Sequence, residues 1–249
     1  MSESQSHTMS DGRRIAFRTL EGTGPVLVFL PGYMSDMAGG KASAVFDWAR
    51  ANGRACLLLD YSGCGESSGD FAQGTLTRWR DEVLALVEAE TSGKVVLVGS
   101  SMGGWLMLLC GLELGAKNDG RLAGLVGIAA APDFTDWGYS DEEKAQLGAG
   151  EPVFTPNEYG YDPTPIHPPF WLDGQAHRLL DDTIGIDCPV RLLHGQRDAD
   201  VPWEIALRLA AQLGSADVQL TLVKDGDHRL SREEDIALLL RVIAALPGD

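Results

Sequence analysis

Two adjacent serines in the stretch GSSMGG, residues 99–104, could supply a nucleophile. A serine hydroxyl attacks a carbonyl carbon when a base removes its proton and the backbone projects its oxygen outward. A sharp turn from strand to helix gives this projection and favours glycine two residues before and two residues after the serine. Gly99 and Gly103 bracket Ser101 in this way, whereas the residues two away from Ser100 are apolar. Ser101 is the candidate nucleophile and Ser100 is expected to be structural; the alternative is a glycine-rich turn that opens a helix and binds a phosphate.

A serine nucleophile of this kind needs a histidine and an acid, which in one known order follow it along the chain. Asp198, in HGQRDADVPW, follows the second-to-last apolar run, and His228, in KDGDHRL, follows the last one. We therefore expect His228 to act as the base and Asp198 to orient it. The other acids of these two loops fit these positions less well; they are Asp200, Asp225 and Asp227.

The remaining histidines are weaker candidates for the base. His7 lies in an N-terminus that is expected to be frayed, and His167 and His177 lie in a segment of poor periodicity. His194 ends a strand-like run four residues before Asp198, where it is expected to make a structural hydrogen bond at the turn.

The transition state of such a reaction needs two backbone N–H groups that bind a developing oxyanion. One should come from Met102, the residue after the candidate serine. The other should come from the loop PGYMSDMAGGK, where Tyr33 follows Gly32 and can donate, whereas Pro31 has no backbone N–H.

The elements that must position these residues are short apolar runs alternating with longer stretches of helical period. This alternation is typical of parallel βαβ units, so the sequence predicts an α/β fold with a mostly parallel central sheet flanked by helices. An alternating run at 13–21 could be an antiparallel edge strand. The expected buried strands are 25–31, 55–60, 94–99, 122–130, 189–195 and 217–223, and the expected helices are 39–52, 76–91, 102–115, 203–213 and 232–246.

One segment, residues 133–187, breaks this rhythm and holds six of the chain's twelve prolines. We expect residues 1–132 and 188–249 to form a single core, with 133–187 inserted as a lid or cap over the sheet. The alternative is a long surface excursion packed on the body. The aromatic residues that could cover a pocket are Trp137, Phe154, Tyr159, Tyr161, Phe170 and Trp171.

The composition restricts the partners of the chain. A formal net charge of −16 argues against nucleic-acid binding, because contacts to phosphates require clustered Lys and Arg. No apolar run approaches the length of a membrane span, and the N-terminus has neither a signal-like apolar region nor an arginine-rich transit composition, so a cytoplasmic location is expected. The four cysteines have no metal-like spacing and are expected to be reduced thiols, mostly in the core.

The motifs LPGYMSDMAGGKA, DYSGCGESSG, LVGSSMGGWLML, LLHGQRDADVPW and DHRL together resemble the α/β-hydrolase superfamily. Within it, the sequence is similar to the branch of palmitoyl-protein thioesterases and acyl-glucuronide esterases, as a bacterial relative of a mitochondrial enzyme. The resemblance implies a triad of Ser101, Asp198 and His228 and an oxyanion hole formed by Tyr33 and Met102.

The expected function is that of a serine hydrolase, a carboxylesterase or thioesterase that cleaves ester or thioester bonds through an acyl-enzyme intermediate. The substrate would be a small-molecule ester or thioester or an acylated protein, with neither a metal nor an organic cofactor. Two alternatives remain open: a hydrolase of carbon–carbon bonds on the same triad, and a non-catalytic ligand-binding member of the fold.

Overall fold

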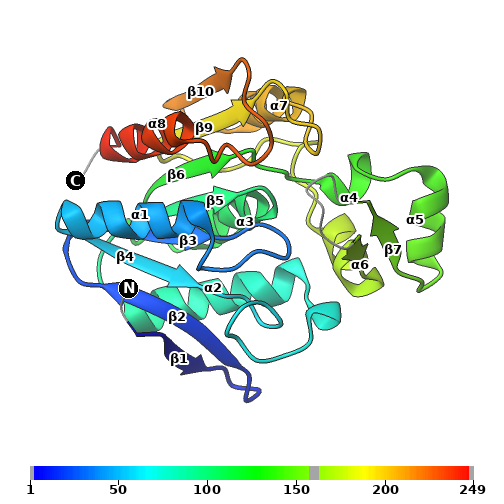
Figure 1. Ribbon diagram of the computed structural model, residues 1–249, viewed down its shortest axis with the longest axis horizontal. Helices are drawn as coiled ribbons and strands as arrows, with labels where there is room; N and C mark the ends of the chain where they lie inside the picture. The colour runs from blue at the N-terminus through cyan, green and yellow to red at the C-terminus, as the bar shows by residue number, and fades with distance from the viewer. Residues whose placement is uncertain (1–2, 157–162, 247–249) are drawn as a thin grey trace.

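The computed structural model describes residues 3–156 and 163–246, and within these ranges the main sheet has eight strands in the order β1-β2-β4-β3-β5-β6-β9-β10 (Figure 1). All neighbouring pairs from β4 to β10 are parallel, whereas β1–β2 and β2–β4 are antiparallel. The strands are β1 Gln5–Thr8, β2 Arg14–Leu20, β3 Thr23–Leu30, β4 Arg54–Leu59, β5 Val95–Ser100, β6 Leu122–Ile128, β9 Val190–Gly195 and β10 Val218–Val223.

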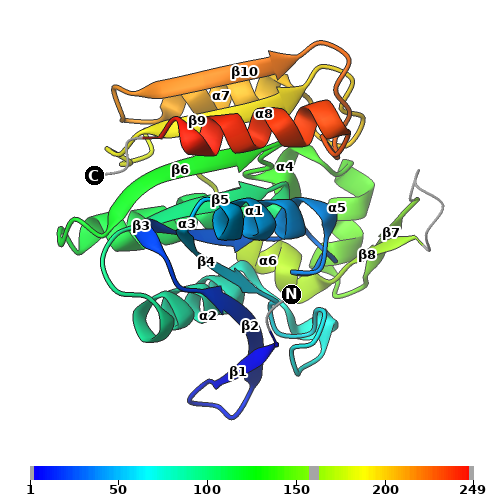
Figure 2. The ribbon, with the colours of Figure 1, turned by 60° about the vertical axis from the view of Figure 1, so that its left-hand side comes forward.

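Five helices cover the two faces of the sheet, and each face has its own apolar core. The helices are α1 Gly40–Ala51, α2 Leu76–Glu90, α3 Met102–Ala116, α7 Glu204–Gln212 and α8 Glu233–Ala244. Helices α1 and α8 lie on the near face of the sheet in Figure 2. Side chains of α1 and α8 pack in one core, and side chains of α2, α3 and α7 pack in the other. Because the central strands are covered on both faces, they read as continuous apolar runs, and every residue of β5 is buried.

The predicted α/β architecture is confirmed, and the predicted strands and helices lie within a few residues of their expected positions. The run at 13–21 does form an antiparallel strand, β2, but it is not the edge of the sheet. The polar strand β1 pairs outside it, so His7 is part of the sheet edge rather than of a frayed terminus. Four polar residues carry no periodicity that a sequence pattern could detect.

The helices and hairpin of the segment 133–187 lie beyond the carboxyl ends of the parallel strands (Figure 1), whereas Leu180, Ile184 and Ile186, near its end, pack in the same core as α2, α3 and α7. Contrary to its poor periodicity, the segment contains regular elements: α4 Phe134–Trp137, α5 Asp141–Gly148, a hairpin of β7 Val153–Thr155 with β8 Thr164–Ile166, and α6 Pro168–Ala176. It leaves the sheet after β6 and returns before β9, and these two strands are hydrogen-bonded neighbours. Of its aromatic residues, Tyr159 and Tyr161 lie outside the described residues.

Two side chains of the body, those of Thr77 and Trp105, make polar contacts with this segment. The hydroxyl of Thr77, in α2, lies 2.7 Å from Asp173 Oδ1 and 2.7 Å from His177 Nε2. The indole N–H of the buried Trp105, in α3, donates to the carbonyl of His177 at 3.1 Å. Trp105 therefore packs within the protein.

No helix in the described ranges is long and apolar enough to cross a membrane.

Candidate active site

Ser101 lies at the tight turn between β5 and α3. Its φ of 56° and ψ of −122° place it in a backbone conformation that non-glycine residues rarely adopt. A Cβ atom on Gly99 would lie 2.2 Å from the carbonyl oxygen of Gly103, and one on Gly103 would lie 2.1 Å from the carbonyl oxygen of Leu30. The two glycines are therefore required because helix and strand approach each other too closely for a side chain. Ser100, by contrast, is buried.

The side chains of Ser101, His228 and Asp198 follow one another within hydrogen-bond distance, although 127 positions of sequence separate Ser101 from His228. Ser101 Oγ is 3.0 Å from His228 Nε2, and His228 Nδ1 is 2.8 Å from Asp198 Oδ2. A carboxylate only accepts hydrogen bonds, so Nδ1 carries the proton and Nε2 is free to accept the hydrogen of the serine hydroxyl. The side chain of His228 is 16% exposed and that of Asp198 is completely buried.

Asp198 is held by more donors than His228 alone. Its Oδ1 accepts the backbone N–H groups of Asp200 at 2.9 Å and Val201 at 2.8 Å. Burial by itself would raise the pKa of Asp198, but the hydrogen bonds from His194 and His228 hold that pKa well below its usual range. The acid therefore stays ionised beside His228.

The other candidate acids and histidines have different partners. The carboxylate of Asp225 pairs with Arg232, and that of Asp227 accepts the backbone N–H of Leu230. His7 Nδ1 is 3.7 Å from Glu90 on α2. His167 and His177 flank α6.

The contact of His194 with Asp198 was not expected from the sequence. His194 does make the expected structural hydrogen bond, to the carbonyl of Val201 at 3.0 Å, but the same Nε2 atom is also 3.2 Å from Asp198 Oδ2. The spacing of four residues in HGQRD was the available signal.

The loop after β3 approaches Ser101 closely. A Cβ on Gly32 would lie 3.4 Å from Ser101 Cβ, so the chain at Gly32 and Tyr33 runs beside Ser101. The buried carboxylate of Asp60 anchors this loop by accepting the N–H of Met37 at 2.7 Å, and burial raises the pKa of that carboxyl. Met102 begins α3 and is buried.

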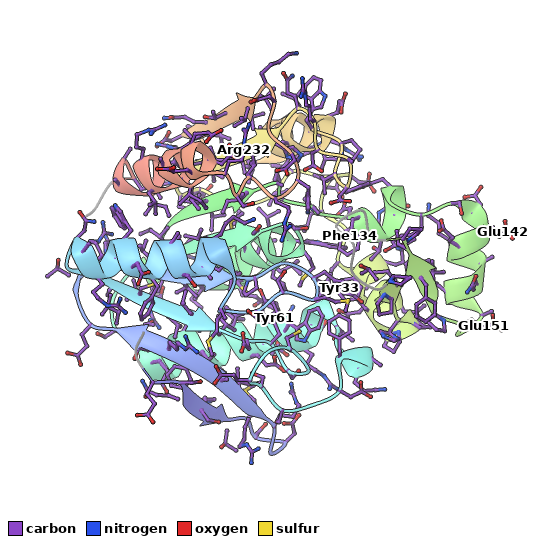
Figure 3. The ribbon with its side chains drawn as sticks, viewed as in Figure 1. Tyr33, Tyr61, Phe134, Glu142, Glu151 and Arg232 are labelled. Atoms are coloured by element: carbon purple, nitrogen blue, oxygen red, sulfur yellow. The ribbon has the colours of Figure 1, made fainter. Side chains whose placement is uncertain are left out.

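The side chain of Tyr33 points away from the loop into an aromatic cluster between body and insertion (Figure 3). Its ring centroid is 4.9 Å from those of Phe71 and Phe170, and its hydroxyl donates to the carbonyl of Pro165 at 3.0 Å. Burial raises the pKa of this phenol well above its usual range. Phe134 joins the cluster from α4, so the cluster packs the insertion against the loop that follows β3.

A hollow of about 230 Å³ lies next to this loop, lined by residues 34–36 and 63–65 and by Phe71. Cys64, in its wall, is buried, and burial raises the pKa of its thiol to about 12, so it is not an activated nucleophile. Among the described residues, Asp198, Asp200 and His228 bring side-chain atoms within 4.8 Å of one another, an arrangement that the hydrogen bond between Asp198 and His228 accounts for.

The family of this chain follows from its similarity to known proteins. Residues 27–239 match the model of the alpha/beta hydrolase family, so the chain belongs to this family. Among curated relatives, the mitochondrial palmitoyl-protein thioesterase ABHD10 of Mus musculus is 38% identical over 235 residues, which cover 92% of this chain and 77% of the relative. The Homo sapiens protein of the same name is 35% identical over 233 residues, with 92% and 75% covered.

Two solved structures that are more than 30% identical to this chain share its fold over almost its whole length. A putative hydrolase from Agrobacterium vitis superimposes with a TM-score of 0.91 at 39% identity, over 98% of this chain and 99% of that one. Alpha/beta hydrolase domain-containing protein 10 from mouse superimposes with a TM-score of 0.90 at 36% identity, over 98% of both chains. Est1E from Butyrivibrio proteoclasticus, at 19% identity and a TM-score of 0.76, shares the fold.

Proposed function

We propose that the chain is a serine hydrolase that cleaves carboxylic ester or thioester bonds through an acyl-enzyme intermediate. Ser101 is the nucleophile, His228 the general base and acid, and Asp198 the acid that orients His228. The backbone N–H groups of Tyr33 and Met102 form the oxyanion hole. The observation that carries the proposal is the continuous line of hydrogen bonds from Ser101 through His228 to Asp198.

In the first step, His228 Nε2 takes the hydroxyl proton as Ser101 Oγ attacks the carbonyl carbon of the substrate. The imidazolium that forms is stabilised by the ionised Asp198 at 2.8 Å. Negative charge develops on the former carbonyl oxygen. The N–H groups of Tyr33 and Met102 donate hydrogen bonds to this oxygen, and the N-terminus of α3 faces it with the positive end of the helix dipole. Collapse of this tetrahedral intermediate breaks the bond to the leaving alcohol or thiol, which takes a proton from His228.

In the second step, His228 removes a proton from a water molecule that attacks the acyl carbon bound to Ser101. A second tetrahedral intermediate forms with its oxyanion in the same hole. Its collapse releases the carboxylic acid and returns the proton from His228 to Ser101, so the free enzyme is restored.

For the substrate we propose an acyl thioester or ester, carried either by a small molecule or by an acylated protein. The support comes from the palmitoyl-protein thioesterases to which the chain is 35–38% identical. We further propose that residues 133–187 act as a lid that shapes the acyl site. Their position beyond the carboxyl ends of the strands and the aromatic cluster around Tyr33 support this role.

The test is burst kinetics with p-nitrophenyl acetate, butyrate and octanoate and with a palmitoyl-thioester analogue, for the wild type, Ser101→Ala and Ser100→Ala. Ser100→Ala is the matched control, because it removes the neighbouring hydroxyl from the same turn. Ser101→Ala is expected to abolish the burst and to lower turnover by about three orders of magnitude or more, with the circular dichroism spectrum unchanged. Ser100→Ala should keep the burst.

The chain-length profile distinguishes the substrate classes. A preference for octanoate and the palmitoyl thioester supports a long-chain thioesterase, whereas a preference for acetate supports a small-ester esterase. A folded wild type without turnover on any of these substrates would contradict the proposal and favour a carbon–carbon bond hydrolase or a ligand-binding protein.

A further inference from the structure

His194, the penultimate residue of β9, shares one nitrogen between two acceptors. Its side chain is completely buried, and Nε2 is 3.0 Å from the carbonyl oxygen of Val201 and 3.2 Å from Asp198 Oδ2. A carbonyl oxygen and an ionised carboxylate can only accept hydrogen bonds. The hydrogen must therefore lie on Nε2, where it bonds to the carbonyl oxygen of Val201 and also faces Oδ2 of Asp198, whose pKa it lowers.

The other ring nitrogen of His194, Nδ1, is buried and has no hydrogen-bond acceptor or donor beside it among the described residues. A proton on Nδ1 would add both a buried charge and an unpaired donor, which is costly in an apolar interior. The geometry therefore places hydrogen on Nε2 of His194, an N–H dipole whose positive end faces Asp198.

Asp198 thus receives a complete set of donors. The backbone N–H groups of Asp200 and Val201 occupy Oδ1, and the side chains of His228 and His194 share Oδ2. Because His194 also binds the carbonyl of Val201, a single imidazole connects both ends of the turn from Asp198 to Val201. This turn carries the acid, so its conformation sets the direction from Oδ2 to His228.

We propose that His194 is a positioning residue for Asp198, holding Oδ2 so that its remaining lone pair faces the Nδ1–H group of His228. The inference rests on the proposed function, in which Asp198 orients the catalytic base. His194 touches neither the substrate nor the reacting atoms; it acts through the acid. A hydrogen bond to a charged carboxylate is roughly twice as strong as one between neutral groups, so its loss should be measurable.

The proposal predicts the direction of a change in pH dependence. Removing the His194 donor concentrates negative charge on Oδ2 and stabilises the protonated form of His228, so the acid limb of kcat/KM should move to higher pH. The charged groups that face this pair stay the same in the variants. Asp200 lies on the loop of the acid, and Lys41 of α1 donates to the carbonyl of Arg229, next to His228.

The experiment compares His194→Met with His194→Gln. Methionine approximates the volume but has no donor, whereas glutamine can place an amide N–H near the position of Nε2. In His194→Met, kcat/KM for a p-nitrophenyl ester should fall about 10- to 100-fold, the range found for hydrogen-bond partners that orient metal ligands, and the acid limb should move up by about half a pH unit or more. His194→Gln should keep the acid limb of the pH profile at its wild-type position and retain most of the wild-type kcat/KM.

The outcomes separate this inference from the proposed function. Unchanged kinetics in His194→Met, or a lower rate with the acid limb in place, would overturn the positioning role. A wild type without Ser101-dependent turnover would instead contradict the proposed function. If His194→Met does not fold, ¹⁵N-histidine NMR of the wild type replaces it as the test, with His194→Gln used to assign the His194 signals. Hydrogen on Nε2 of His194 from pH 5 to 9 supports the positioning role. Hydrogen on Nδ1 in its place overturns it.

Discussion

The backbone N–H of Leu180 donates to the carboxylate of Asp133 at 2.8 Å, although the two residues are 47 positions apart. The N–H of Leu179 donates to the same carboxylate. Asp133 begins the inserted segment and Leu179 and Leu180 lie near its end, so one buried side chain ties the two ends of the segment together. Burial raises the pKa of Asp133, and these two hydrogen bonds partly offset that increase.

Asp133→Ala should lower the free energy of unfolding by about 2–4 kcal/mol, because it leaves one or two buried N–H groups unpaired. Alanine also fits poorly at a φ of 59°, which asparagine tolerates better. Asp133→Asn should therefore cost less than Asp133→Ala. Urea unfolding monitored by circular dichroism measures both variants, and equal losses would contradict this account.

Gly103→Ala should disrupt the turn that carries Ser101. The added methyl would lie 2.1 Å from the carbonyl oxygen of Leu30 and 2.4 Å from that of Pro31, and backbone atoms cannot move aside easily. We expect a loss of about 3 kcal/mol or more and no esterase activity. Gly115→Ala is the control in the same helix, since nothing lies within 4 Å of its Cβ, and it should stabilise α3 by about 0.5–1 kcal/mol. Thermal unfolding that ranks the two variants equally would refute the steric argument.

Asp198 should make the protein sensitive to acid. Its pKa in the folded protein is held well below its ordinary value of 3.8, so ionised Asp198 contributes stability at any pH above that value. This contribution is lost progressively as the pH falls below about 4 toward the folded-state pKa. The difference in unfolding free energy between the wild type and Asp198→Asn should shrink from pH 5 to pH 3. Urea titrations at pH 5, 4 and 3 measure it; a constant difference would show that the charge contributes nothing.

Thr77→Val should loosen the contact between α6 and the body. The hydroxyl of Thr77 donates to Asp173, which leaves its oxygen to accept from His177 Nε2. Without the hydroxyl, amide hydrogen exchange in α6 should become faster, while exchange in β5 and α3 stays the same. Thr77→Ser keeps the hydroxyl and should behave like the wild type. Equal exchange in the two variants would mean that this contact does not hold α6.

Much of the sheet and the approach of Ser101, Asp198 and His228 to one another could be predicted, because the signals are local. The spacing of Gly99 and Gly103 distinguishes Ser101 from Ser100, and the steric contacts at both glycines give the physical reason. The order of Asp198 and His228 after the last two strands suffices to bring them together, since the carboxyl ends of parallel strands lie at the same edge of the sheet.

The rest depends on contacts that no local pattern encodes. Strand β1 is short and polar, and it is held by its pairing with β2. Helices α4 to α6 are short, and much of their packing is against one another and against Tyr33. The second contact of His194 arises because the turn after β9 folds back toward the strand end, which a spacing of four residues only suggests.

The adjacency of β6 and β9 has an evolutionary consequence. Because the segment of residues 133–187 departs from one strand and returns to its hydrogen-bonded neighbour, its ends are already close together at Asp133 and Leu180. A segment of different length or sequence can be grafted between these two points while the register of the sheet stays intact. The fold therefore allows the length and sequence of this segment to change with the sheet intact, whereas Tyr33, whose ring packs against Phe134 and Phe170, must adjust to any such change.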